Sequence, residues 1–444
     1  MRFSLWIIVF VFFYSTENLI AQDTTYYGSI QSIINKKCVS CHKANGYAPF
    51  DLSNYDDVKQ RASFIKYVVQ NRIMPPWKAN NNYRDFADDK SLNDDEIALI
   101  VKWVDSGCMK GRGDINSVPI ASLSDVNKPD LVLTMLDTFS VPGNNKNTYI
   151  CYKIPFEINH DTFVKAVEFF PGNKSVVHHA SYQILEVADD VDVFKGPYYF
   201  MYDADTLNRV NDKYDYKYLH LIGNHGELPV ELYHNGWLPG SSLQKYPSDI
   251  GFRLPKKGVL LIRNFHYSPT PIIQKDLSGF NIYYSSTSPS RKIGFAAFKP
   301  KNPKPDGKWV IEAGDSNFKS VINIRFHNDV SLLNINPHMH RLGRYFKAYA
   351  ITPNQDTIKL VEILNWDFNW QEFYRFRHML KIPAGSILHA EAIYDNSANN
   401  PENPNNPPKD ILFEWGMNDD SEMMRLVLLY LPYKKGDENI SLEH

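Results

Sequence analysis

Six residues between positions 178 and 423 carry side chains that copper binds well in proteins. Imidazole nitrogen suits copper in either redox state, and thioether sulfur suits the softer, reduced ion. Copper that moves between one-electron states can activate dioxygen, so these residue types favour redox chemistry. Zinc also accepts three histidines and is the competing interpretation, although it rarely takes a thioether. The six residues are His178, His179, His266, His338, His340 and Met423.

The spacing of these residues restricts how the fold must place them. On a strand, His338 and His340 would share one face and chelate one ion, while the methionine between them points into packing. His178 and His179 are adjacent, so a regular strand would turn them to opposite sides. If both bind one ion, the strand must bulge or end there. His266 closes an apolar run that reads as a strand.

A second group, Cys38, Cys41 and His42, forms the sequence Cys-Val-Ser-Cys-His. Two thiols at this spacing can bond covalently to haem, and the histidine that follows can bind the iron axially. Zinc binding is the alternative use of such a pattern. Met74 is the predicted sixth iron ligand, because a methionine opposite a histidine raises the reduction potential; the alternative is that it packs in the core. We therefore predict one covalent haem c.

Composition and the N-terminus indicate export. The chain has 48 Lys+Arg against 50 Asp+Glu, so it lacks the basic footprint of a nucleic-acid-binding protein. Arg2, the apolar run Leu5–Tyr14 and a cleavage site near Ala21 are typical of a signal peptide, with a retained anchor as the alternative. No later segment is long and apolar enough to be an integral membrane segment. We predict a secreted or periplasmic protein.

Two cysteines remain outside the haem motif. Cys108 and Cys151 could pair in an oxidising compartment. The sequence cannot establish that they lie close together, and two buried free thiols are the favoured interpretation.

The pattern of apolar residues divides the chain into a helical part and a strand-rich part. Helices are predicted at Ser29–Lys36, Asp56–Gln70 and Asn93–Ser106, the last with a capping box between Asn93 and Glu96. From about residue 125, short β-branched and aromatic runs alternate with turns, which favours β-sandwiches. A Pro- and Lys-rich stretch, 299–305, is the predicted linker between two β domains. The clearest strand candidates are Val259–His266, Phe346–Thr352, Ile387–Tyr394 and Arg425–Leu431.

Two family resemblances rest on quoted stretches of this sequence. Residues 38–113, with CVSCH, IMPPW and LNDDEIALIVKWVDSG, resemble a class I cytochrome c domain. Residues from about 128 to 432 resemble the copper type II, ascorbate-dependent monooxygenases, which include peptidylglycine α-hydroxylating and dopamine β-monooxygenases. The closest likeness is to bacterial members with an N-terminal cytochrome c domain. The stretches that carry this resemblance are VVHHASYQI, GWLPG, NFHYSPT, NPHMHRLG and DDSEMMRLVLLY.

The resemblance implies a fold class: a small all-α cytochrome c domain followed by two all-β jelly-roll-like sandwich domains. The expected parts are a signal peptide (1–21), the cytochrome c-like domain (24–113) and β domains at 125–300 and 306–436. It also implies two copper ions. His178, His179 and His266 match the ligands of the electron-transfer copper, and His338, His340 and Met423 match the ligands of the copper that binds dioxygen and substrate.

Departures from the family pattern concern the substrate. Peptidylglycine enzymes carry an arginine two residues before the His-x-His pair, where this chain has Asn336. They carry Asn and Tyr after the methionine ligand, where this chain has Arg425 and Val427. A pocket for a peptide carboxylate is therefore not expected. Arg425 would either hold an anionic substrate or pair with a surface carboxylate.

These observations predict an exported, copper- and haem-dependent monooxygenase that hydroxylates a C–H bond of a small organic substrate with dioxygen. The cytochrome domain is expected to relay electrons, in place of or alongside an external, ascorbate-like reductant or a redox partner protein. The alternative is a non-catalytic haem- and copper-containing electron-transfer or copper-binding protein.

Overall fold

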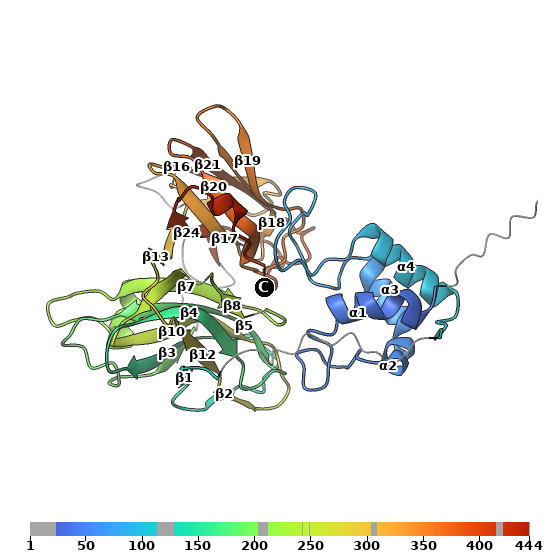
Figure 1. The fold of residues 1–444 in the computed structure, drawn as a ribbon, viewed down its shortest axis with the longest axis horizontal. Helices are drawn as coiled ribbons and strands as arrows, with labels where there is room; N and C mark the ends of the chain where they lie inside the picture. The colour runs from blue at the N-terminus through green and yellow to red at the C-terminus, as the bar shows by residue number, and fades with distance from the viewer. Residues whose placement is uncertain are drawn as a thin grey trace, which may run out of the picture.

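The computed structural model describes residues 24–112, 128–202, 212–241, 243–247, 249–302, 309–413 and 421–443. The predicted signal peptide and part of the predicted linker lie outside these residues. Figure 1 shows a small helical part, coloured blue, beside two groups of β-sheets. In the described part of the chain, no helix combines the length and the apolar character needed to cross a lipid bilayer.

The helical part is built on one small core. α3 and α4 pack together over Ile65, Val69, Ile100 and Trp103. Asn93 and Glu96 form the predicted capping box of α4, which agrees with the predicted helix to within one residue at each end. The elements are η1 (Tyr26–Ile30), α1 (Gln31–Lys37), α2 (Tyr55–Gln60), α3 (Ala62–Gln70) and α4 (Asp94–Asp105).

The stretch between α3 and α4 is not helical and belongs to a different core. Two consecutive prolines and a run of asparagines oppose helix formation here. Ala79 forms a β-bridge with Ile363, and Phe86 forms one with Phe376, so both side chains join the core of the β-sheets. The Nδ2 amide of Asn80 also donates to the Glu362 carboxylate at 2.6 Å.

The predicted fold class, a small all-α domain followed by two all-β jelly-roll-like sandwiches, is therefore wrong. Strands predominate among the described residues, and the longest helix there has 12 residues. The helices near the N-terminus are short and do not make a sizeable all-α domain, because the stretch from Ala79 to Phe86, between α3 and α4, leaves them and packs on a distant sheet. Helical periodicity in three short windows could not reveal that contact.

The first group of sheets packs face to face. A six-stranded sheet has the order β1-β12-β4-β9-β13, with β8 paired to β4, and a five-stranded sheet has the order β6-β3-β10-β5-β7. Tyr233 stacks on Phe252 across the two layers, with ring centroids 4.0 Å apart. The strands are β1 (Leu131–Thr134), β3 (Thr148–Glu157), β4 (Thr162–Phe170), β5 (Val177–Glu186), β6 (Tyr199–Met201), β7 (Val230–Trp237), β8 (Gln244–Lys245), β9 (Ile250–Leu254), β10 (Lys257–Tyr267), β12 (Gly279–Tyr284) and β13 (Arg291–Lys292).

Three smaller elements border this group. β2 (Phe139–Val141) pairs with β11 (Gln274–Asp276). On the outer face of the five-stranded sheet, α6 (Asp212–Tyr218) contributes to a separate core that contains Cys151. Cys108 lies in the helical core instead, and the two cysteines are not disulfide-bonded, as favoured above.

The second group consists of two four-stranded sheets, ordered β14-β24-β17-β20 and β16-β21-β18-β19, and a small β15-β22-β23 sheet. β21 matches its predicted strand residue for residue. β14 already pairs with β24, so this group begins before the predicted linker. The strands are β14 (Gly294–Phe298), β15 (Val310–Ile311), β16 (Phe318–Arg325), β17 (Val330–His338), β18 (Gly343–Ile351), β19 (Thr357–Ile363), β20 (Tyr374–Ile382), β21 (Ile387–Tyr394), β22 (Ile411–Phe413), β23 (Ser421–Glu422) and β24 (Arg425–Pro432), followed by η3 (Asp437–Asn439).

Candidate metal centres

The first candidate centre lies where β5 and β10 meet. His178 and His179 stand at the start of β5, and His266 stands near the end of β10, opposite His179 in the strand pairing. The pairing register shifts on both sides of His266, and Asn264 has φ 51°. These irregularities let side chains of adjacent residues turn toward one point, which the sequence required of any shared ion.

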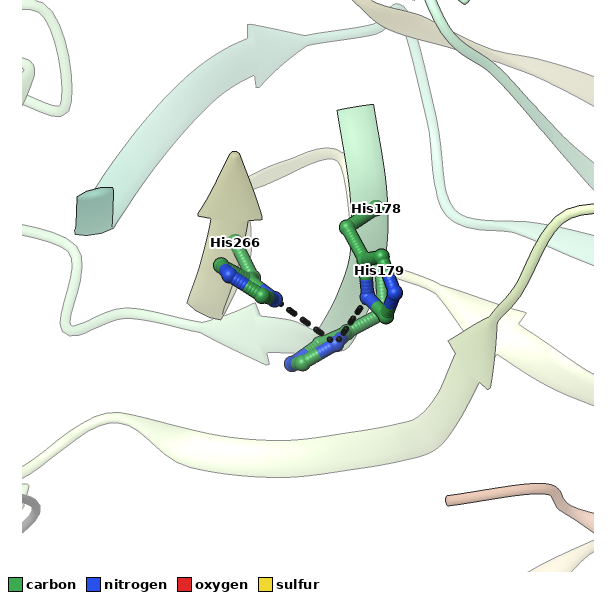
Figure 2. A group of neighbouring side chains, drawn as sticks. All are labelled: His178, His179 and His266. Atoms are coloured by element: carbon green, nitrogen blue, oxygen red, sulfur yellow. Dashed lines mark hydrogen bonds between the residues drawn. The ribbon is translucent and has the colours of Figure 1, made fainter. Parts of the chain in front are cut away.

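The three imidazoles of this centre converge (Figure 2). The Nδ1 atom of His179 lies 3.2 Å from Nδ1 of His178 and 3.4 Å from Nδ1 of His266. One nitrogen from each ring lies within 4.8 Å of the others. Asn147 Oδ1 accepts a hydrogen bond from His266 Nε2 at 2.8 Å, which leaves the His266 Nδ1 lone pair facing the other rings.

Burial keeps these imidazoles neutral. It lowers the pKa of His266 and of His179 well below the ordinary value, and the neighbouring histidines lower both further. The Nε2 atom of His179 is buried without a hydrogen-bond partner among the described residues. Three neutral rings with lone pairs aimed at one point are suited to a soft or borderline metal ion such as copper or zinc.

The second candidate centre surrounds the His-x-His pair. β17 ends at His338, so His340 lies beyond the strand, and the expectation that both histidines lie on a strand is wrong. Their rings nevertheless remain neighbours, with centroids 5.2 Å apart. Met339 between them is fully buried in the core, as expected. Met423, also buried, lies in the link between β23 and β24.

Hydrogen bonds select the ring nitrogens available in the second centre. His338 Nδ1 donates to the side-chain oxygen of Gln371, and His340 Nδ1 donates to the backbone oxygen of Ser421 at 2.8 Å. Both rings therefore present Nε2 to a ligand. This arrangement of an outer hydrogen-bond partner on each histidine is typical of metal sites.

A buried glutamate that the sequence reasoning missed joins the two parts of this centre. Glu422 is 1% exposed, and its carboxylate accepts backbone N–H bonds from His340 and Leu342 at 3.0 Å and from Met423 at 3.3 Å. It thereby ties the His-x-His turn to the methionine. Its signal in the sequence was a carboxylate directly before Met423, at the end of an acidic stretch that leads into β24.

The two centres lie within electrostatic reach of each other, since a charge on His338 would contribute to lowering the pKa of His179. Burial lowers the pKa of His338 itself to about 3, with His340 as the next cause.

The metal-free protein should lose stability as the pH falls below about 6.5. Unfolded histidines bind protons near that pH, whereas folded His179, His266 and His338 do not, so acid favours the unfolded state. Each imidazole should contribute a slope that approaches about 1.4 kcal/mol per pH unit. Urea unfolding at pH 7, 6 and 5 measures it, and His338→Gln should flatten the slope. Equal stability at pH 7 and 5 would contradict the prediction.

The haem motif lies at the edge of the helical part, against the first group of sheets. His42 Nδ1 donates to the Phe50 carbonyl at 3.2 Å, so the Nε2 atom of the same ring is left to act as a ligand of iron. The Cys41 sulfur lies 2.6 Å from the position that a Cβ on Gly240 would take. Tyr47 packs edge-on against Trp237, with centroids 5.3 Å apart.

Met74, the predicted sixth iron ligand, is 38% exposed and lines a cavity of about 1260 Å³. Val69, Leu92 and Ile97 of the helical part line the same cavity, and Trp370 lines it from the second group of sheets. Cys38, Cys41 and His42 do not line it.

The two candidate substrate residues have different surroundings. Asn336 is buried, and its amide donates to the backbone oxygens of Glu372 and Gln371 at 2.9 and 3.4 Å. Arg425 stands opposite His338 in the β17–β24 pairing, and its charge helps to lower the pKa of His338. Arg425 Nη1 also donates to the Met424 carbonyl at 3.0 Å.

Comparison with known proteins gives one family match. Residues 318–431 match the model of the copper type II ascorbate-dependent monooxygenase C-terminal domain, which bears out the resemblance to that family and does not bear on the resemblance to cytochrome c. The matched region contains His338, His340 and Met423. The chain matches none of the curated proteins with which it was compared.

Solved structures give weak similarities. The infectious bursal disease virus VP2 subviral particle is 8% identical, covering 69% of this chain and 72% of that chain, with a TM-score of 0.19. The PBCV-1 VP54 structure fitted into a reconstruction of the virophage Sputnik is 9% identical, covering 70% and 99%, with a TM-score of 0.21. Scores this low establish no shared fold.

Proposed function

We propose that this chain, whose residues 318–431 match the copper type II ascorbate-dependent monooxygenase C-terminal domain, is an exported copper monooxygenase. The observation that carries the proposal is the pair of centres, one of three converging histidines and one of two neighbouring histidines joined through Glu422 to a buried methionine. The reaction hydroxylates a C–H bond of a small organic substrate. One oxygen atom of dioxygen enters the product, and the other leaves as water after two electrons and two protons are taken up.

The donor atoms fit copper at both centres. His178, His179 and His266 would hold one ion through Nδ1 atoms, since His266 Nε2 is engaged by Asn147. His338 and His340 would hold the other through Nε2, with the Met423 thioether favouring the reduced ion. Copper at these positions supplies one-electron redox chemistry toward dioxygen.

The residues around the second centre position its ligands and limit the water around them. Gln371 and the Ser421 carbonyl fix the orientation of the two rings, and Glu422 fixes the backbone between them. Such outer contacts typically change metal affinity or activity by about 10- to 100-fold when they are removed. Electrons would come from an ascorbate-like reductant, from a redox partner or from a haem in the same chain.

A covalent haem c is part of the proposal. What supports it is the Cys-Val-Ser-Cys-His sequence together with the orientation of His42, whose Nδ1 bond to the Phe50 carbonyl leaves Nε2 for iron. Maturation of such a haem requires export, which fits a periplasmic or secreted protein.

Metal analysis and oxygen uptake test the proposed activity. Protein made with copper and with haem maturation should contain two coppers per chain and consume dioxygen in the presence of ascorbate and a candidate substrate. One copper, or zinc at both centres, would refute it. Copper binding and redox cycling without product from any substrate would favour the alternative, a non-catalytic electron-transfer protein.

The substrate is proposed to be something other than a glycine-extended peptide. Asn336 stands at the position of the carboxylate-binding arginine, and its amide is already bonded to the backbone. Loss of a charge-assisted contact to a carboxylate costs about 1.5–3 kcal/mol. Arg425, next to the second centre, is the group that would hold a substrate anion.

Met74→Ala should lower the reduction potential of the haem and open the iron to exogenous ligands, because the thioether is the proposed ligand opposite His42. Redox titration and cyanide binding, followed by absorbance, measure both changes. Met109→Ala, which removes a comparably exposed methionine elsewhere in the helical part, is the control. An unchanged spectrum and potential in Met74→Ala would exclude this ligand.

A further inference from the structure

The loop between β19 and β20, residues 364–373, touches both candidate metal centres. It is called the bridging loop below. The bridging loop has the sequence LNWDFNWQEF and contains none of the six predicted metal ligands. Phe373 at its end packs against β7, so that a side chain on Gly236 would collide with its ring.

Trp370 of the bridging loop makes the contact with the first centre. Its ring lies 6.1 Å from the ring of His178, measured between centroids. This contact joins the second group of sheets to a ligand of the first centre. The same tryptophan lines the cavity beside Met74.

Gln371, the next residue along the chain, makes the contact with the second centre. Gln371 accepts a hydrogen bond from His338 Nδ1 through its side-chain oxygen. Gln371 also donates to the Phe368 carbonyl at 2.8 Å, which fixes its amide orientation. His178 is therefore connected to His338 in three steps. These are the ring contact with Trp370, the covalent chain from Trp370 to Gln371, and the hydrogen bond from His338 to Gln371.

Further contacts hold the bridging loop in place. The Trp370 N–H donates to the Asp367 carbonyl at 3.0 Å, and the Asp367 carboxylate pairs with Lys78 at 2.9 Å. Trp366 Nε1 donates to the His340 carbonyl at 3.1 Å. The connection is thus built from ordered, mutually supporting groups.

We propose that Trp370 and Gln371 form the electron-transfer connection between the two centres. This inference rests on the proposed copper monooxygenase activity. A copper ion held by His178, His179 and His266 would lose one electron, and a copper ion held by His338, His340 and Met423 would gain it. No bond forms or breaks in the transfer, and the two residues supply the covalent and hydrogen-bonded route. Trp370 and Gln371 are relay and positioning residues, since neither is a ligand.

The test follows copper oxidation without any substrate. Fully reduced, copper-loaded protein is mixed with dioxygen, and freeze-quench electron paramagnetic resonance follows Cu(II) at each centre. His266→Ala and Met423→Ala supply the reference spectra of the single centres. In Trp370→Leu, Cu(II) should appear at the second centre at the wild-type rate. At the first centre of the same variant, Cu(II) should appear at least about tenfold more slowly than in the wild type. A tenfold change corresponds to an increase of about 1.4 kcal/mol in the activation free energy.

Variants of Gln371 test the connection independently of Trp370. Gln371→Leu should slow the first centre in the same way, whereas Gln371→Glu should restore the rate because a carboxylate oxygen still accepts from His338 Nδ1. In the metal-free protein, nitrogen NMR should show a changed His338 tautomer in Gln371→Leu and not in Gln371→Glu. Trp77→Leu, which alters the same cavity away from both centres, is the matched control and should behave as wild type.

Two results would overturn the inference in distinguishable ways. Two bound coppers with an unchanged first-centre rate in both Trp370→Leu and Gln371→Leu would refute the connection and leave the proposed function standing. Fewer than two coppers in the wild-type protein would refute both.

Discussion

Glu422→Ala should destabilise the protein by about 3 kcal/mol or more and empty the second centre. The Glu422 carboxylate is buried and accepts N–H bonds from His340, Leu342 and Met423. Each buried donor left without an acceptor costs about 1–3 kcal/mol. The two ligand segments would then separate, so copper should be lost from the second centre and oxygen consumption should cease. Thermal unfolding and copper analysis measure the two effects.

Two variants separate a local effect from general unfolding. Glu422→Gln keeps one acceptor oxygen and should fold with an intermediate loss of stability. Tyr394→Phe removes the hydroxyl that donates to the Met423 carbonyl at 3.0 Å and should cost less, since only one bond is lost. Wild-type copper content and melting temperature in Glu422→Ala would show that the carboxylate does not hold the centre together.

His266→Ala should remove about one copper per chain, leave the other bound and abolish coupled turnover. His266 stands between His179 and Asn147, and its loss leaves two ligands at the first centre. Two imidazoles bind copper far more weakly than three ligands do in a preformed site. Metal analysis and electron paramagnetic resonance of the oxidised protein measure the remaining ion.

The reciprocal variant is the control for that experiment. Met423→Ala should spare the copper at the three-histidine centre and weaken reduced copper at the other. If His266→Ala lost both ions, or neither, the assignment of His266 to a separate first centre would be wrong.

Local features of the fold could be predicted where neighbouring residues determine them. The capping box of Asn93 and Glu96 indicated the start of α4, and short runs of β-branched and aromatic residues between turns located β10 and β21. Adjacent His178 and His179 required an irregular strand, and the strand pairing indeed skips His178, since consecutive His266 and Tyr267 pair with His179 and Val177. Each of these signals depends on residues close together in the sequence, so it can be recognised without knowledge of the tertiary structure.

Features set by distant residues could not be predicted. Gln371 is 33 positions from His338, and Asn147 is 119 positions from His266, so nothing in the local sequence links them. The expected all-α domain failed for the same reason, since the bridge from Phe86 to Phe376 exists only after the β-sheets have formed. Metal-ligand residue types are visible in a sequence, whereas their supporting hydrogen bonds are not.

The N-terminal part of the chain is fastened to both groups of sheets. Tyr47 packs on Trp237 of the first group, and Phe86 packs on Tyr374 and Phe376 of the second. A hinge movement that separated the two groups would have to break one of these contacts. We therefore expect the N-terminal part to act as a brace that resists any change in the distance between the two candidate metal centres during turnover.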